Sequence, residues 1–343
     1  PVIGEIVYDK DGNPETIPGS LKHVKAIGWY IEEFGIAQIS MNLTNITETP
    51  IHTVFEEVVK KASARGASVT GSELVGLIPL KSMIDAGKYF LKKQNRSIGI
   101  PEEDIIKIAI ESLGLNQVKP FDPTKNIIEY YLDKITNKNG KLIDMSSRNF
   151  SDEVSRETPA PGGGSVSSYV GALGTSLAGM VANLSCNTRG WENKVEIFSE
   201  KAHDINLLRE ELLSLVDEDA HSFNSIMEAY KLPKDSEENK RIRSKAINNA
   251  TLYAAQIPLK IMIEAYNSYE IIEFLANEGN QNSLSDSGVA CLCIHTAIHG
   301  AYLNVRINLK DVSDGEDIMK KADKILKDSH LKKEKIMKLV EDK

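Results

Sequence analysis

The chain has 343 residues, enough for two domains of ordinary size. Apolar residues make up 41% of it, which excludes a chain that is disordered throughout. Its 41 Lys and Arg stand against 49 Asp and Glu, and the net charge of −8 argues against a general nucleic-acid binder. Three cysteines without zinc-site spacing do not make a disulfide framework, so we expect a reducing, cytoplasmic location. Because the chain begins with Pro1 and not Met, we also expect it to be part of a longer protein.

The first third alternates between strand and helix patterns. Residues 36–44 alternate strictly between apolar and polar side chains, the period of a half-buried strand, and residues 24–33 form its predicted hairpin partner across Phe34. The remaining predicted elements are a helix over 54–64, a strand over 68–78 and a helix from Pro79 to about 93. This order predicts an α+β fold with helices packed on one face of a sheet.

A polar stretch around Asn139-Gly140 has no apolar period and marks a domain boundary. We therefore predict a first domain over residues 1–133, a linker over 134–146 and an all-helical domain over 147–343. Two segments without acidic or basic residues, 165–188 and 287–305, are too rich in Ser, Thr, Asn and His for membrane spans. They are predicted to be helices buried on all sides, with no membrane-spanning role.

A run of three glycines is the most informative motif of the helical region. In Thr158-Pro-Ala-Pro-Gly-Gly-Gly-Ser165 the glycines Gly162, Gly163 and Gly164 let a ligand approach the backbone at the start of a helix. The alternative is a sharp turn in which Ser165 caps the helix. No Gly-Lys-Ser/Thr follows, so this is not a phosphate-binding loop of the P-loop type.

A carboxylate falls on the core face of the long helix predicted over residues 196–230. The apolar stripe passes through Leu212 and Val216 to Phe223, and Asp219 lies in phase with it, whereas Asp217 does not. Burial raises the pKa of such a carboxyl group, which suits general acid–base catalysis. The alternative is a structural carboxylate bonded to a neighbouring helix end.

Two further groups of polar residues are candidate ligands. Asn280, Asn282 and Asp286 precede the second uncharged helix and offer contacts to a heteroaromatic ring, although Ser285 or Asp286 could simply cap that helix. His295 and His299 have metal-ligand spacing, but no third ligand is indicated, so we predict no metal.

Small residues line one face of the first uncharged helix, which predicts close helix packing within the chain or between subunits. With two buried helices in a domain of this size, we expect at least a homodimer. The residues of this stripe are Ser167, Gly171, Gly174, Ala178 and Ala182.

Taken together, the motifs of the helical region resemble the formimidoyltetrahydrofolate cyclodeaminase domain. The residues that carry the resemblance are Glu157–Ser165, Asp219-Ala220-x-x-Phe223, Leu232-Pro233-Lys234, Gly279-Asn280-x-Asn282-x-x-Ser285-Asp286 and Asn304-Val305-x-Ile307-Asn308. The first third resembles the C-terminal subdomain of glutamate formimidoyltransferase, which is ferredoxin-like, through Pro18-Gly19-x-Leu21-Lys22, Gly28-Trp29-Tyr30 and Gly71–Leu80. The two domains in this order resemble the bifunctional formimidoyltransferase-cyclodeaminase family of histidine degradation.

The resemblance implies closure of 5-formimidoyltetrahydrofolate to 5,10-methenyltetrahydrofolate with loss of ammonia. It implies a folate substrate, with polyglutamate expected on it, and no cofactor beyond that tetrahydrofolate. Asp219 is the first candidate for proton transfer and Asp286 the second. Gly162–Gly164, Ser165, Asn280 and Asn282 would hold the substrate. Neither His23 nor His52 matches the transferase's catalytic histidine, so we expect no unaided formimidoyl transfer.

Two alternatives remain open at this point. One is a methenyltetrahydrofolate cyclohydrolase on the same scaffold, in which water replaces ammonia at the same carbon. The other is a non-catalytic module that binds polyglutamylfolate or supports assembly, whose folate binding would be indifferent to Asp219→Asn.

Overall fold

A computed structural model of the protein describes residues 6–15, 18–33, 35–136, 141–310, 312 and 315–342. The chain divides into two compact units, one made of Pro1–Phe90 with Ile106–Tyr131 and one of Leu91–Ile105 with Leu132–Lys343. Phe34 of the predicted hairpin turn and residues 137–140 of the predicted linker lie outside the described residues.

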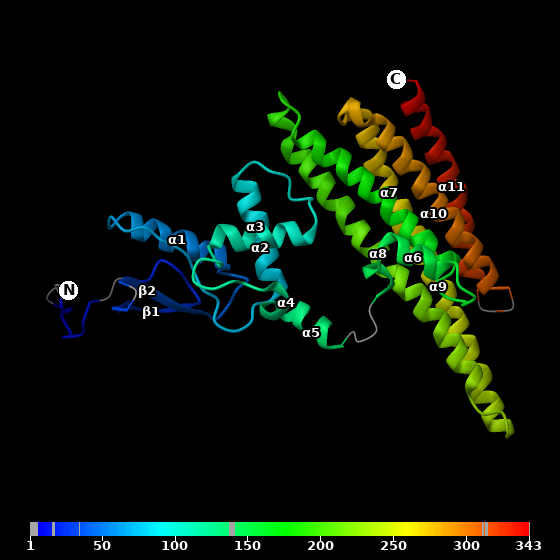
Figure 1. Ribbon diagram of the computed structural model, residues 1–343, viewed down its shortest axis with the longest axis horizontal. Coiled ribbons are helices and arrows are strands. Elements are labelled where there is room, and N and C mark those ends of the chain that lie inside the picture. Colours follow the sequence, from blue (N-terminus) through cyan, green and yellow to red (C-terminus); the bar gives the residue numbers. More distant parts are fainter. Residues whose placement is uncertain are drawn as a thin grey trace. The chain divides into compact units, whose positions relative to one another are not determined.

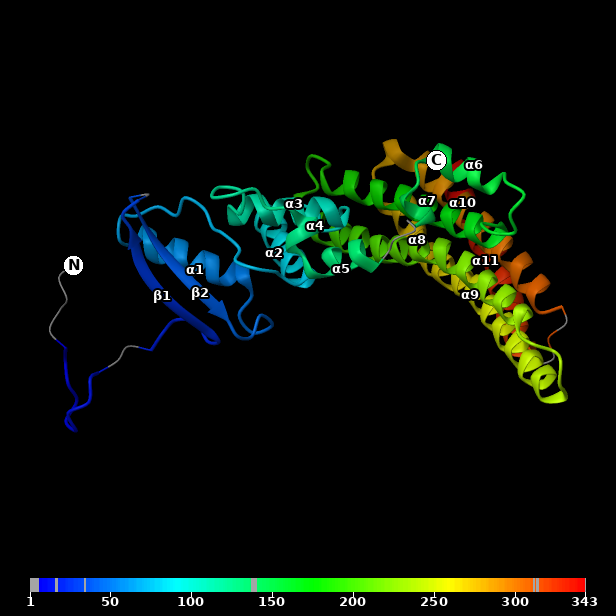
Figure 2. The same ribbon diagram turned by 60° about the horizontal axis from the view of Figure 1, so that its bottom comes forward.

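The first unit contains one antiparallel hairpin and several helices, as Figure 1 shows. β1 (Val24–Ile31) pairs with β2 (Ile36–Leu43), with Val24 opposite Leu43, and this confirms the predicted hairpin. Figures 1 and 2 both show α1 alongside these strands. The helices that begin in or belong to this region are α1 (Ile51–Ser63), α2 (Leu80–Lys93), α3 (Glu102–Leu113), α4 (Pro123–Asn126) and α5 (Ile128–Thr136).

The predicted strand over residues 68–78 is wrong. Its backbone bonds to loop and helix-end carbonyls instead of a neighbouring strand: Ser72 N donates to Gly114 O at 3.1 Å and Ile78 N to Asn126 O at 2.9 Å. Gly76, at a φ of +90°, breaks the extended conformation. The unit is therefore α+β with a two-stranded sheet, and its core lies between α2 and α3 around Met83, Ala86, Ile106, Ala109 and Ile110.

The second unit is helical among its described residues, as predicted for the region after residue 147. Its long helices lie side by side in Figures 1 and 2, and α7 packs against α8, α9 and α10. Its elements are η1 (Leu142–Asp144), α6 (Ser147–Val154), α7 (Gly163–Cys186), η2 (Glu192–Lys194), α8 (Val195–Lys231), α9 (Glu237–Glu278), η3 (Gln281–Ser283), α10 (Leu284–Asn308) and α11 (Glu316–Glu341).

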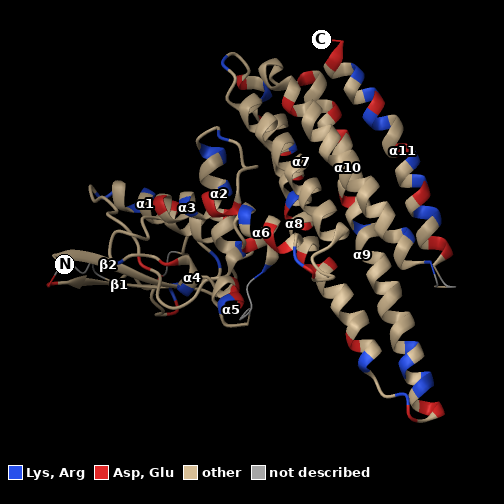
Figure 3. Cartoon of the chain, turned by 45° about the vertical axis from the view of Figure 1, so that its right-hand side comes forward, with Lys and Arg blue, Asp and Glu red and all other residues tan. Residues whose placement is uncertain are grey.

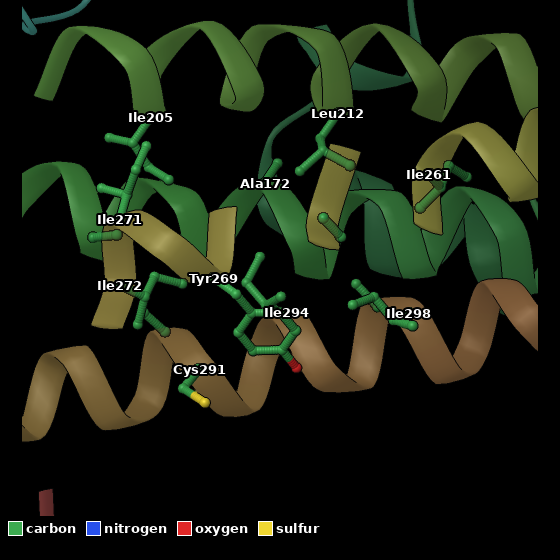
Figure 4. Packing of buried hydrophobic residues seen from close by; sticks show 14 of the residues in the cluster. Ala172, Ile205, Leu212, Ile261, Tyr269, Ile271, Ile272, Cys291, Ile294 and Ile298 are labelled. Atoms are coloured by element: carbon green, nitrogen blue, oxygen red, sulfur yellow. The ribbon is translucent and has the colours of Figure 1, made fainter. Parts of the chain in front are cut away.

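Small side chains bring α10 and α8 close to α7. A Cβ on Gly171 would lie 3.1 Å from the Ala297 side chain and 3.3 Å from Leu212, and one on Gly174 would lie 3.0 Å from Ala290 O. The small-residue stripe therefore serves packing inside one chain. Figure 4 shows the branched side chains that fill the space around it, including Ile205, Leu212, Ile294 and Ile298.

The segment between α2 and α3 belongs to the helical unit through hydrogen bonds to α7 and α8. Ile98 N donates to Ser199 Oγ at 3.0 Å, and Asn183 Nδ2 donates to Gly99 O at 2.9 Å. Gly99 lies so close to the backbone of Ala202 that a side chain on it would overlap α8. Sequence patterns gave no sign of this long-range anchor, since it joins positions about a hundred residues apart.

Among the described residues, one helical segment, Gln281–Asn308, is long and apolar enough to span a membrane by length and composition alone. Its most apolar window is 44% buried within the protein. A core helix of a folded domain passes the same test, so this is weak evidence for a span. The C-terminal helix α11 has the opposite character, since lysines and acidic residues cover its outer face in Figure 3 while Ala322, Ser329 and Ile336 are buried.

A cluster of imidazoles lies between α10 and α11 and makes the stability of the helical unit depend on pH. His295 Nδ1 lies 2.9 Å from Ser329 Oγ, which in turn lies 2.9 Å from Tyr269 OH. Burial, reinforced by His330, Lys333 and His299, lowers the pKa of His295 to about 4. Since the unfolded chain takes up this proton near pH 6.5, the stability tied to neutral His295 is complete above that pH and is lost toward pH 4.

We predict that the free energy of unfolding falls by about 1–2 kcal/mol between pH 6.5 and 4 on account of His295, after allowance for the solvent near this partly exposed ring. Urea unfolding of the wild type and of His295→Asn at several pH values measures this. The variant can still hydrogen-bond Ser329 but does not titrate, so its stability should fall less steeply. Equal slopes for the two proteins would contradict the assignment.

Candidate active site

The candidate site is built around the first turn of α7, where the glycine run places the helix start. The helix begins at Gly163 with Gly162 as its N-cap residue, so it starts two residues earlier than Ser165. The expectation that Ser165 caps this helix is therefore wrong. The backbone N–H of Ser165 instead donates a hydrogen bond to a carboxylate from another helix.

Asp219 of α8 supplies that carboxylate. Ser165 N donates to Asp219 Oδ2 at 2.7 Å, and Ser165 Oγ donates to the same oxygen at 2.9 Å. This places the negative group at the positive end of the α7 dipole. Asp219 follows the buried Leu212 and Val216 along α8 and contacts α7, in accord with the predicted helical phase. Asp217 and Glu218 are partly buried as Asp219 is, so the partners of the three carboxylates distinguish them and their exposure does not.

Gly164 is the residue that lets the two helices approach at this point. A Cβ on Gly164 would overlap the Asp219 carboxylate, lying 2.5 Å from Cγ and 2.7 Å from Oδ2. A real Cβ does not approach other atoms so closely, so only glycine leaves room for the carboxylate here. The glycine run and Asp219 were identified separately in the sequence, and the structure brings them into contact.

The environment of Asp219 changes its acidity in two opposing ways. Burial raises the pKa of its carboxyl group, while the two hydrogen bonds from Ser165 lower it, and burial is the larger effect. The net result is a pKa above the ordinary value of 3.8. A carboxyl group of this kind can accept a proton and return it near neutral pH more readily than an exposed one.

Asp217, two residues earlier on α8, has a structural role. Its carboxylate accepts hydrogen bonds from Leu142 N at 2.6 Å and Ile143 N at 3.4 Å, which ties η1 to the long helix. The neighbouring Glu218 accepts a hydrogen bond from Tyr253 OH on α9. The three successive acidic residues therefore face three different partners, and Ser165 is the partner of Asp219.

The second group of predicted residues lies elsewhere. Asn280 N donates to Ser185 Oγ at 2.9 Å, which places this cluster at the C-terminal end of α7. With 24 residues in α7, the two ends are about 35 Å apart at 1.5 Å per residue. Within one chain, Asn280, Asn282 and Asp286 therefore do not reach the glycine turn.

The details of this second cluster differ from the capping expectation. Ser283 is the N-cap residue of α10, and Asn280 Oδ1 accepts a hydrogen bond from Asn282 N at 3.0 Å to begin η3. Asp286 lies in the first turn of α10 and is partly buried, so neither it nor Ser285 caps the helix. Within the described ranges, no group of three His, Cys, Asp or Glu side chains is placed to hold a metal ion.

One further residue at the glycine turn is named by sequence reasoning only as part of a motif. Asn304 of α10 lies against Gly163, since a Cβ there would come within 3.0 Å of Asn304 Nδ2. Its helical phase is the signal that could have identified it. Asn304 follows Ala297 and Ala301 on the buried face of α10, and a polar amide on such a face normally has a hydrogen-bonding partner.

Comparisons with known proteins identify the family of the chain. The family model described as "Formiminotransferase-cyclodeaminase" matches residues 146–327, and the one described as "Formiminotransferase domain" matches residues 5–133. Formimidoyltransferase-cyclodeaminase of Mus musculus is 38% identical over 305 residues, which cover 89% of this chain and 56% of that protein. The chain thus spans about half the length of the curated relatives it matches.

Two other proteins are matched over almost their whole length. Methenyltetrahydrofolate cyclohydrolase of Methylorubrum extorquens is 30% identical over 197 residues, 57% of this chain and 95% of that protein. The crystal structure of formiminotetrahydrofolate cyclodeaminase from Thermotoga maritima superposes with a TM-score of 0.51 at 30% identity, covering 59% of this chain and 96% of that one. The chain belongs to the formiminotransferase-cyclodeaminase family.

Proposed function

We propose that the helical unit is a cyclodeaminase that converts 5-formimidoyltetrahydrofolate to 5,10-methenyltetrahydrofolate and ammonia. The observation that carries this proposal is the partly buried Asp219 carboxylate, whose pKa is raised, held by Ser165 over the glycine turn. Family membership supplies the substrate class, through the relatives named for a cyclodeaminase activity.

The chemistry needs one group that first takes and then gives a proton. The folate N10 attacks the amidine carbon, and Asp219 takes the proton that N10 releases. That proton then passes from Asp219 to the terminal nitrogen of the formimidoyl group, which starts as an amidinium cation. The C–N bond breaks with its electron pair leaving on ammonia, and the N5 lone pair forms the new C=N bond, so the amidinium charge ends on the N5–C–N10 methenyl cation. Charge and protons balance within this cycle, and a single carboxyl group with a raised pKa can perform both transfers. No metal or organic cofactor is required, because the folate is itself the substrate.

The roles at the glycine turn divide accordingly. Ser165, predicted as a substrate ligand, uses its N–H and hydroxyl to hold Asp219, so it positions the carboxylate. The backbone of Gly162, Gly163 and Gly164 lies at the positive end of α7, which suits an electron-rich group of the folate.

A cyclohydrolase is the second candidate, and the relative from Methylorubrum extorquens favours it. In that reaction water attacks the methenyl carbon, so the same carboxylate would take a proton from water in place of N10. Incubation of the purified chain with each substrate separates the two. Ammonia release from the formimidoyl compound supports the cyclodeaminase, and hydrolysis of the methenyl compound alone supports the cyclohydrolase.

We also propose assignments for the N-terminal unit and for the cellular role of the chain. The N-terminal unit would represent part of a ferredoxin-like transferase subdomain, supported by the match over residues 5–133 and by the observed hairpin. The chain would act in the cytoplasm, in histidine degradation and one-carbon metabolism, on a polyglutamylated folate. The match to two-domain relatives supports a bifunctional parent protein.

We further propose a homodimer in which both ends of α7 contribute to each site. Exposed apolar side chains follow one face of α7 at Leu173, Met180 and Leu184, and one face of α10 at Val289, Leu292, Leu303 and Ile307. A two-fold axis between antiparallel copies of such a face would bring the Asp286 end of one subunit to the Asp219 end of its partner. The two ends of α7 are about 35 Å apart within one chain, at about 1.5 Å per residue. The dimer would still let residues from both ends line one folate site, because each end comes from a different subunit.

We predict that Asp219→Asn lowers the rate of ammonia release by about 10²–10⁴-fold, the usual contribution of a general acid–base group. Both Ser165 donors contact the same Asp219 oxygen, so an amide oxygen can replace it and the fold should persist. Ammonia assay and circular dichroism of the wild type and the variant measure these two effects.

Two matched variants on α8 serve as controls for Asp219→Asn. Asp204→Asn removes an exposed carboxylate and should change nothing. Asp217→Asn weakens the link to Leu142 and should lower stability more than rate. Equal loss of activity in all three variants, or unfolding of Asp219→Asn, would show that Asp219 is structural.

We predict that Gly164→Ala lowers the turnover rate by about 10²-fold, since a displacement of about 1 Å at a reacting group has effects of that size. The new Cβ must push the Asp219 carboxylate away from Ser165. Gly179→Ala on the same helix is the control, because its Cβ would lie 3.5 Å from Ile205, an ordinary contact. That control should keep full activity and gain up to ~1 kcal/mol of helix stability. Full activity in Gly164→Ala would contradict the geometry.

We predict that Asp219→Asn and Asp286→Asn subunits complement each other. Each homodimer should be inactive, whereas a heterodimer carries both substitutions in one site and neither in the other. Its activity should be about half that of the wild type. Co-expression with two different affinity tags gives the pure heterodimer. An active Asp286→Asn homodimer, an inactive heterodimer, or a fully active monomer by light scattering would each refute the shared site.

A further inference from the structure

Two adjacent glycines of α7 each accommodate a polar side chain from a different helix. Gly164 leaves room for the Asp219 carboxylate of α8, and Gly163 leaves room for the Asn304 amide of α10. A Cβ on Gly163 would lie 3.0 Å from Asn304 Nδ2 and 3.4 Å from Oδ1. The carboxylate and the amide therefore flank the same helical turn, at neighbouring positions.

The amide of Asn304 has a fixed orientation. Its Nδ2 donates to Gly300 O, one turn earlier on α10, at 2.8 Å. Because Gly300 O is an acceptor, the nitrogen must face it and Oδ1 must face the opposite way. Oδ1 is therefore the atom of this amide that is left to accept a hydrogen bond, and the side chain is partly buried. Asn304 thus presents a preoriented acceptor beside the glycine turn.

A contact between α7 and α10 fixes how closely Asn304 approaches the glycine turn. Ser167 Oγ donates to Gly163 O at 2.6 Å, and Gly300 lies directly against that hydroxyl, so that a side chain on Gly300 would overlap it. The residues Gly163, Ser167 and Gly300 therefore fix the distance between Asn304 and the first turn of α7.

We propose that Asn304 Oδ1 accepts a hydrogen bond from the substrate nitrogen that leaves as ammonia. This rests on the proposed cyclodeaminase function. A formimidoyl group is an amidinium cation with N–H donors, and a neutral amide oxygen binds such donors without taking the proton that must stay with the leaving nitrogen. The methenyl product has no N–H on the reacting carbon. Asn304 is thus a residue that distinguishes the formimidoyl compound from the methenyl compound.

The test measures equilibrium binding of both folates in the Asp219→Asn background, where turnover is suppressed. Adding Asn304→Leu removes the acceptor and keeps the volume of the side chain. We expect the dissociation constant for 5-formimidoyltetrahydrofolate to rise about 10-fold or more, as for a hydrogen bond to a charged group. The constant for 5,10-methenyltetrahydrofolate should change less than about 2-fold.

Asn308→Leu is the matched control, because Asn308 Nδ2 also donates to a backbone carbonyl, that of Ala254, at 2.7 Å. It should lower the melting temperature without selective loss of either folate. Equal weakening of both folates by Asn304→Leu, or unchanged affinity for the formimidoyl compound, would overturn the proposal. Failure of the function itself is seen separately, as absence of ammonia release by the wild type.

Discussion

The two hydrogen bonds from Ser165 to one oxygen of Asp219 set the geometry on which the rest of the helical unit's chemistry depends. They join the start of α7 to the middle of α8, and they form only because Gly164 has no side chain. The same burial that requires these bonds also raises the pKa of the carboxyl group. A carboxyl group that is costly to bury is therefore held by two hydrogen bonds, and its raised pKa makes it a candidate for proton transfer.

Close packing of the helices around α7 allows the contact between Ser165 and Asp219. Gly171 and Gly174 let α10 and α8 approach α7, and Gly300 does the same at the level of Ser167. Close-packed helices deform little, so side chains anchored on them keep their positions better than side chains on loops. The active-site candidates Asp219 and Asn304 both project from such helices, and both lie against the first turn of α7 at Gly163 and Gly164.

The sequence predicted the parts of this arrangement that depend on local pattern. Strict alternation identified β2, helical phase identified Asp219 as core-facing, and the glycine run marked the start of α7. Patterns could not reveal pairings between distant segments. Residues 68–78 look like a strand, yet Ser72 bonds to the end of α3, and the Ser165–Asp219 bond joins positions 54 residues apart. The sequence patterns also did not show that Asn280 lies far from the glycine turn. That distance follows from the length of α7, whose two ends carry the two clusters.

The most direct test of the account is the pH at which Asp219 itself titrates, measured by infrared difference spectroscopy of the wild type against Asp219→Asn. The account predicts a midpoint above the ordinary 3.8, and a fall in ammonia release as the pH drops through that same midpoint, since the carboxylate is the form that accepts the proton. A midpoint at or below 3.8, or ammonia release that persists after Asp219 is protonated, would contradict it.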